Sequence, residues 1–188
     1  MLEALLVSTG LVAIAEIGDK TQLLAMLLAA RFRKPLPIIF GILVATLANH
    51  ALAATLGHLA GGFFEGPWMR WVLGVAFIGF AAWALIPDKF EDDEAPPNLK
   101  AGSVFLTTTI AFFLVEMGDK TQVATIALGA RFDSILMVTA GTTLGMMIAN
   151  VPAVLLGEVA GKKLPLNWIR IAAAIGFASV GLWILLFG

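Results

Sequence analysis

The sequence superimposes on itself without a gap when it is shifted by one hundred residues, and about two dozen of roughly 88 aligned positions are then identical. The longest match pairs the segment EIGDKTQ at 16–22 with EMGDKTQ at 116–122. A second match, ARF, occurs at 30–32 and again at 130–132. The chain is therefore an internal duplication, and the structure adopted by its first half is expected to occur twice.

The composition indicates that most of the surface faces lipid. Apolar residues make up 60% of the 188 positions and charged residues 13%, and the mean hydropathy is +0.94. A water-soluble domain of this length cannot bury so much apolar surface. The formal net charge of -1 lacks the basic excess expected of a nucleic-acid binder, so that class is excluded. Cysteine is absent and there are only two histidines, so a bound metal would be held by oxygen ligands.

Six apolar stretches are long enough to cross a hydrocarbon core of about 30 Å as helices. We predict them at 4–30, 36–61, 68–87, 101–130, 135–160 and 166–187. The roughly ten-residue alternating segments of a transmembrane barrel are absent, so the expected fold is an all-α integral membrane protein. The predicted units are a first three-helix repeat at 1–87, an acidic linker at 88–100 and a second three-helix repeat at 101–188.

An odd number of spans in each repeat requires the second repeat to enter the membrane from the opposite side. Such inverted repeats are typical of secondary transporters, which bind their substrate near the midplane where the repeats meet. The basic residues of the short loops set the orientation. On one side we place Arg31, Arg33, Lys34, Lys89, Lys100, Lys162, Lys163 and Arg170, and on the other only Arg70 and Arg131. The richer side should be cytoplasmic, which places both termini on the non-cytoplasmic side.

The repeated motif puts acidic residues deep in the membrane. Within a continuous helix, Glu16 and Asp19 would lie about 60° apart and Gln22 would continue the same edge. The second repeat supplies the equivalent residues Glu116, Asp119 and Gln122. An ionised carboxylate at that depth costs at least about 2.5–3.5 kcal/mol. These six residues are therefore predicted to face a common partner, and a cation is the partner that carboxylate and amide oxygens suit best.

The charge of the two motifs also suggests what they exchange. Lys20 and Lys120 each follow a glutamate by four residues, the favourable order for a helical ion pair. Four carboxylates and two ammonium groups leave about −2, which one divalent cation or two protons would neutralise. Alternating occupancy by metal and protons is what an antiporter needs. Carboxylate and amide oxygens are hard ligands, suited to Ca²⁺, Mg²⁺ or Mn²⁺.

Other polar residues of the apolar stretches have two interpretations each. Thr21 and Thr121 either coordinate the cation or cap and pack, because they point away from the glutamates on a regular helix. Asn49, His50 and Asn150 are expected to form hydrogen bonds between helices, and His50 alternatively to relay protons. The acid and lysine pairs could themselves serve only to hold helices together, although packing does not require four carboxylates at one depth.

The doubled Glu-x-Gly-Asp-Lys-Thr, at 16–21 and 116–121, on two three-helix repeats joined by an acidic linker, resembles the Gdt-type cation transporter family, which includes Golgi manganese/calcium transporters and bacterial manganese exporters of the MneA kind. The resemblance covers essentially the whole chain. It implies cation transport in exchange for protons, with a metal site at Glu16, Asp19, Glu116 and Asp119. It further implies a bacterial member in the inner (plasma) membrane that exports Mn²⁺, with the metal as substrate and no resident cofactor.

Three other functions stay open at this point. A Ca²⁺/H⁺ antiporter would use the same hard oxygen ligands. An intramembrane aspartyl protease would use two membrane aspartates as a proton-sharing dyad, but such enzymes carry Gly-x-Gly-Asp, whereas Glu16 or Glu116 stands at the first position here and a lysine follows directly. An assembly protein without transport would not need the acids. The sequence therefore favours a transporter over an enzyme, and it leaves the oligomeric state undetermined.

Overall fold

The computed structural model describes residues 1–63, 66, 68–86, 103–156 and 166–187, and the secondary structure of this part of the chain consists of helices and no strands. The first half contributes α1 (Leu2–Glu16), α2 (Lys20–Phe32), α3 (Pro35–Phe63) and α4 (Met69–Ala84). The second half contributes α5 (Val104–Glu116), α6 (Lys120–Arg131), α7 (Ile135–Leu156) and α9 (Leu166–Phe187). The predicted linker at 88–100 lies outside the described residues.

Among the described residues, three helices are long and apolar enough to cross a membrane, judged by length and composition: Pro35–Gly62, Ile135–Leu156 and Arg170–Phe187. The apolar helices Met69–Ala84 and Val104–Glu116 are shorter. Large apolar side chains lie exposed along these helices, as a lipid-facing surface requires, and examples are Phe40 on α3, Val75 on α4 and Ile175 on α9. The prediction of an all-α membrane protein is therefore confirmed at this level, and the six-span arrangement stays a prediction.

The first span predicted for each repeat consists of two helices, which corrects the expectation of continuous helices at 4–30 and 101–130. The chain breaks between α1 and α2 and, one hundred residues later, between α5 and α6. Gly18 and Gly118 adopt φ values of 85° and 79°, a left-handed conformation that glycine enters without the steric cost of a side chain. The two breaks share one geometry, since the Asp19 N–H donates to the Glu16 carbonyl and the Asp119 N–H to the Glu116 carbonyl, both at 3.1 Å.

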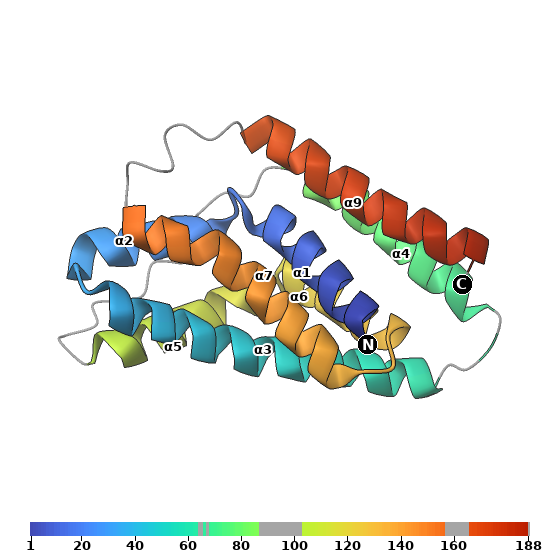
Figure 1. Ribbon diagram of the computed structural model, residues 1–188, viewed down its shortest axis with the longest axis horizontal. Helices are drawn as coiled ribbons and strands as arrows, with labels where there is room; N and C mark the ends of the chain where they lie inside the picture. The colour runs from blue at the N-terminus through green and yellow to red at the C-terminus, as the bar shows by residue number, and fades with distance from the viewer. Residues whose placement is uncertain (64–65, 67, 87–102, 157–165, 188) are drawn as a thin grey trace.

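The halves interlock rather than sit side by side. α1 packs along α7 and α5 packs along α3, so the first helix of each half lies against the third helix of the other (Figure 1). Glycines allow the close approach. A Cβ at Gly141 on α7 would lie 2.6 Å from the Leu5 carbonyl oxygen of α1, and one at Gly41 on α3 would lie 2.9 Å from the Phe105 carbonyl oxygen of α5. The two breaks are thereby brought into the middle of the structure.

α4 and α9 form a separate pair along one flank (Figure 1). Phe77 and Phe80 of α4 contact Phe177 of α9 in tilted and edge-to-face geometry, with ring centroids 6.4 and 6.1 Å apart. The pair contacts the rest of the molecule unevenly: α9 touches α1, and α4 touches α6. The contacts that the repeat would relate to these, α4 with α5 and α9 with α2, are at most marginal among the described residues.

Candidate metal centre

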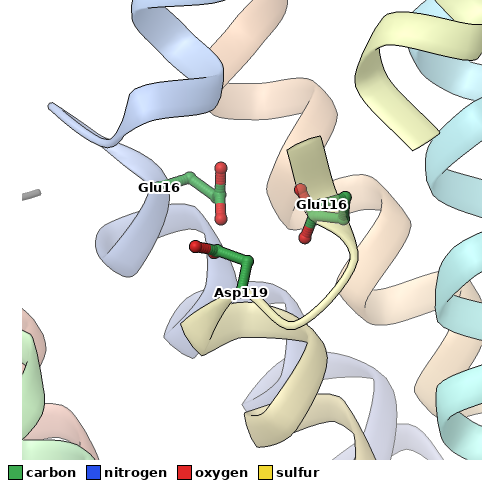
Figure 2. Close-up of side chains that lie close together, drawn as sticks. All are labelled: Glu16, Glu116 and Asp119. Carbon is green, nitrogen blue, oxygen red and sulfur yellow. The ribbon is translucent and has the colours of Figure 1, made fainter. Parts of the chain in front are cut away.

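Three carboxylates from both halves converge between the two helix breaks. Glu16, Glu116 and Asp119 offer oxygens that all lie within 4.8 Å of one another, and their side chains point toward a common space in Figure 2. Their exposed fractions are 0%, 2% and 4%. Asp19, the fourth predicted acid, is also buried, but it lies outside this group of three. The structure thus brings together three of the four acids that the motif predicts.

The ends of the broken helices position these acids. Glu16 and Glu116 are the last residues of α1 and α5. Asp19 and Asp119 are the N-caps of α2 and α6, and each side chain accepts a hydrogen bond from the backbone N–H two residues later at 3.4 Å. Because the two acids of a motif belong to different helices, the 60° relation expected for one continuous helix is wrong.

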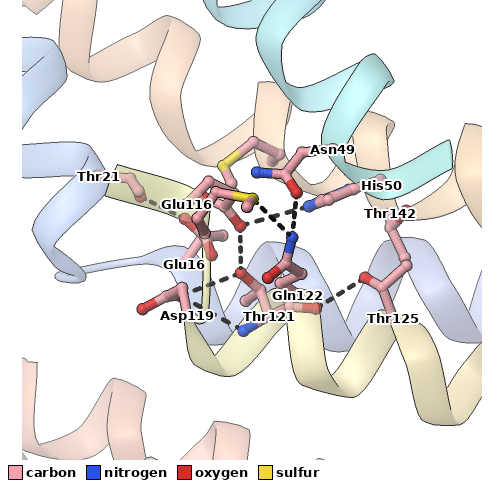
Figure 3. Close-up of polar contacts among 12 residues, drawn as sticks. Glu16, Thr21, Asn49, His50, Glu116, Asp119, Thr121, Gln122, Thr125 and Thr142 are labelled. Carbon is pink, nitrogen blue, oxygen red and sulfur yellow. Dashed lines mark hydrogen bonds and ion pairs between the residues drawn. The ribbon is translucent and has the colours of Figure 1, made fainter. Parts of the chain in front are cut away.

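The two threonines serve the acids directly (Figure 3). The Thr21 hydroxyl donates to Glu16 Oε2 at 2.5 Å. The Thr121 hydroxyl donates to Glu116 Oε1 at 2.7 Å and lies 3.2 Å from Asp119 Oδ2. The break makes these contacts available, because on a regular helix the threonine would face away from the glutamate. Each threonine therefore holds its glutamate in place.

Some oxygens of the cluster remain available for a ligand. Glu16 Oε1 and Glu116 Oε2 are buried and have no hydrogen-bond partner in the described part of the chain. Buried polar atoms without a partner are costly, and closely spaced carboxylates repel each other when ionised. A cation or bound protons would both give these oxygens a partner and reduce the repulsion between the carboxylates. Three carboxylates offer hard oxygen ligands, which fit Ca²⁺, Mg²⁺ or Mn²⁺.

The two glutamines brace the breaks. The amide oxygen of Gln22 accepts from Gly18 N–H at 2.9 Å, and that of Gln122 accepts from Gly118 N–H at 2.6 Å. Each amide nitrogen then donates across to the other half, Gln22 to the Ala149 carbonyl at 3.0 Å and Gln122 to the Asn49 side-chain oxygen. Ligation of metal by these amide oxygens stays a prediction, because the contacts that the structure shows for them are to backbone N–H groups.

The first lysine pairs across the halves rather than within its own motif. Lys20 Nζ lies 3.5 Å from Asp119 Oδ1. Lys120 Nζ donates to the Ile86 carbonyl at 2.9 Å and lies 5.8 Å from the centroid of the Trp83 ring. The helical pairing of Glu16 with Lys20 was the wrong geometry, since the break places the two residues on different helices. Sequence reasoning missed the Lys20–Asp119 pair because no spacing in the chain encodes a contact between the repeats.

Position 50 and its repeat mate behave differently. His50 on α3 is fully buried, and its Nε2 lies 3.4 Å from Glu116 Oε1. Asn150 on α7 instead donates to the Met146 carbonyl of its own helix at 3.1 Å. Next to His50, Asn49 donates to the Phe113 carbonyl of α5 at 3.3 Å, as expected for a bond between helices. The second glutamate therefore has a histidine neighbour.

A pocket of about 30 Å³ reaches the aspartates from the flank where α4 and α9 lie. That volume is enough for a water molecule or a small ion. Asp19 and Asp119 line the pocket together with Lys120 and Arg170, and Trp83 and Phe177 form part of its apolar wall. The side chains of both motifs thus share one small polar space that lies beside α4 and α9.

Comparison with known proteins gives consistent matches over nearly the whole chain. A family model described as "Divalent cation/proton antiporter GDT1" matches residues 4–92 and 104–188. A Vibrio cholerae protein named "Putative manganese exporter" is 50% identical over 171 residues, covering 90% of this chain and 84% of the relative. "GDT1-like protein 3" of Oryza sativa is 28% identical over 188 residues, covering 87% and 67%. "GDT1-like protein 5" of Arabidopsis thaliana is 27% identical over 224 residues, covering 100% and 94%. No solved structure matches the chain.

Proposed function

Because the chain belongs to the divalent cation/proton antiporter family GDT1, we propose that it exports Mn²⁺ from the cytoplasm in exchange for protons, with the metal carried by the acids of its two motifs. The observation that supports this most is the convergence of Glu16, Glu116 and Asp119 from both halves, with glutamate oxygens that have no hydrogen-bond partner among the described residues. The assignment of Mn²⁺ as substrate rests on the relative named as a manganese exporter.

Charge supports the coupling to protons. Three ionised carboxylates beside the ammonium group of Lys20 carry about −2, which a single divalent cation cancels. Once the metal leaves, the buried site has to take up positive charge again, and protons are the available source. Metal binding should then release protons, so the apparent affinity for Mn²⁺ should weaken as the pH falls.

The architecture proposed for this cycle is a pair of inverted three-helix repeats, 1–87 and 101–188, in the inner (plasma) membrane. In the first repeat, α1 and α2 together would make one span, α3 the second and α4 the third. In the second repeat, α5 and α6 together would make one span, α7 the second and α9 the third. The packing of α1 on α7 and of α5 on α3 supports this, because the two contacts are related by the repeat. Both termini would lie on the non-cytoplasmic side. Single-cysteine labelling at residue 2 and at residue 187 in intact cells tests the orientation, and protection of either position contradicts it.

The decisive test of transport uses proteoliposomes that contain a pH-sensitive dye. An inward Mn²⁺ gradient should drive protons out of the vesicles, and protein-free vesicles are the control. Mn²⁺ uptake without any change of internal pH would make the protein a uniporter. A parallel series with Ca²⁺ addresses the closest alternative, since hard oxygen ligands suit both ions. Faster proton-coupled uptake of Ca²⁺ than of Mn²⁺ at equal concentration would make it a Ca²⁺/H⁺ antiporter.

A further inference from the structure

We propose that the two aspartates take turns as metal ligands: Asp119 joins both glutamates in the conformation described here, and Asp19 replaces it when the α4–α9 pair moves to the opposite flank. This inference rests on the proposed transport of a divalent cation. At any moment Asp19 and Asp119 have different roles, although their positions in the motif are equivalent, and they exchange these roles during the cycle.

The first observation is the make-up of the cluster. Both glutamates belong to the group within 4.8 Å, and of the two motif aspartates it includes Asp119 but not Asp19. Lys20 lies beside that aspartate at 3.5 Å, so the group and its counter-ion carry about −2 without Asp19. A divalent cation is therefore matched in charge by three acids and one lysine, and the fourth acid is not needed in this conformation.

The second observation is the uneven packing of the α4–α9 pair. α9 touches α1 and α4 touches α6, whereas the repeat-related contacts, α4 with α5 and α9 with α2, are at most marginal over the described ranges. One tryptophan of each helix lies against a cation of α6, with the ring centroid of Trp83 5.8 Å from Lys120 Nζ and that of Trp183 4.9 Å from Arg131 Cζ. The pair therefore packs against the side of the core that contains α1 and α6 (Figure 1).

Inverted repeats connect these two observations. In a transporter of this kind the second access state is obtained when each repeat adopts the conformation of the other. A shift of one hundred residues converts Asp119 with Lys20 into Asp19 with Lys120, and it converts the tryptophan contacts on α6 into contacts on α2, Trp183 with Lys20 and Trp83 with Arg31. The glutamates map onto each other, so both remain ligands throughout. One lysine at a time then neighbours the aspartate in use.

The pocket marks which flank is in contact with the site. It is lined by Ala84 of α4, whose repeat mate Ile184 is 1% exposed in the apolar core. In the exchanged state the environments of these two positions should exchange as well. Because the natural chain contains no cysteine, a single cysteine at either position reports the state through its rate of reaction with a water-soluble thiol reagent.

The test combines each reporter, Ala84→Cys or Ile184→Cys, with Asp19→Asn or Asp119→Asn. Asparagine is also a good N-cap, so the starts of α2 and α6 are preserved. In Asp19→Asn, Mn²⁺ can bind fully only in the present state, so it should speed labelling at residue 84 and slow it at residue 184. In Asp119→Asn both changes should have the opposite sign. At Mn²⁺ ten times its Kd, a ligand that binds one state alone shifts the equilibrium by about tenfold.

Each single variant should still bind Mn²⁺ by titration calorimetry and elute as a monodisperse peak. If the wild-type chain binds Mn²⁺ but neither variant does, both aspartates are required at once and the inference is wrong. Shifts of the same sign in the two variants, or no shift in either, also overturn it while leaving the proposed function intact. Absence of Mn²⁺ binding by the wild-type chain would instead contradict the proposed function itself.

Discussion

The two copies of the motif have nearly the same sequence and different surroundings. In the second copy, Glu116 and Asp119 both belong to the carboxylate cluster, and Glu116 has His50 beside it. In the first copy only Glu16 belongs to the cluster, and its lysine reaches across to Asp119. A difference of this kind between equal sequences shows that local sequence sets the helix break, whereas the packing of the rest of the chain decides which oxygens meet.

The largest effect is expected from replacing the glutamates, which both copies contribute to the cluster. Glu16→Gln and Glu116→Gln each keep the side-chain volume but delete a charge and a strong ligand. Transport of Mn²⁺ should fall by at least the roughly 10–100-fold that loss of an outer-shell partner costs at metal sites. Cellular Mn²⁺ content under manganese stress measures this, with detergent-extracted protein checked for monodispersity. A folded variant of either glutamate that transports normally would place the metal site elsewhere.

The second-largest effect is expected from replacing the lysines, and it tests whether the difference between the copies is permanent. Lys20→Met and Lys120→Met each remove one positive charge and keep most of the side-chain volume. If the two aspartates alternate, both variants should bind Mn²⁺ about tenfold more tightly, because each removes an ammonium group that repels the cation. A tenfold change corresponds to about 1.4 kcal/mol. Both should also transport more slowly, since release becomes harder. Tighter binding in Lys20→Met alone would mean that the asymmetry is fixed.

A smaller effect concerns position 50, where the copies differ in sequence. Nε2 of His50, when it carries the proton, can donate to Glu116, and a contact of 3.4 Å should contribute about 1 kcal/mol, which is roughly fivefold in Mn²⁺ affinity. His50→Leu should lose that factor, and His50→Gln should recover much of it by offering an N–H at similar reach. Asn150→Leu should change affinity less, because Asn150 donates to its own helix. Equal losses in His50→Gln and His50→Leu would show that the imidazole itself is required.

The smallest effect should be the same in both copies. Gly18→Ala and Gly118→Ala force a side chain into a left-handed backbone conformation, which costs about 1–2 kcal/mol. Around Gly118 a Cβ would meet no atom within 4 Å, so the backbone alone is strained. A fall in Tm of about 2–8 °C is expected for each variant by fluorescence-monitored unfolding. A much larger loss in only one of them would reveal a constraint that the shared break does not explain.

Particular elements show how far the sequence could predict the structure. The duplication and hydropathy located α3, α4, α7 and α9 close to their observed bounds, because length and apolar content are properties of a single segment. Gly18 and Gly118 allow either a local break or a close helix contact, and the sequence could not decide between the two, because one glycine costs a helix only about 1 kcal/mol and does not by itself end it. A glycine followed by aspartate, a favoured N-cap residue, was the available signal.

The acids of the candidate site could be chosen from the sequence, but their arrangement in space could not. Spacing identified the four acids, but it could not show that Asp19 lies outside the cluster, or that Lys20 reaches Asp119. These contacts depend on how α1 crosses α7 and how α5 crosses α3, which is decided by close packing at Gly41 and Gly141. The repeat gave the reason to expect symmetry, and the α4–α9 pair departs from it.

The paired helix breaks bring the ends of four helix dipoles to the centre of the structure. A helix carries about half a positive elementary charge at its N-terminus and half a negative one at its C-terminus. The ends of α1 and α5 bring two negative poles to the centre, and the starts of α2 and α6 bring two positive ones. Because the four poles sum to about zero, the backbone imposes no preference on the total charge of the site. The backbone around the carboxylate cluster therefore stays electrically balanced throughout the proposed exchange of a metal ion for protons.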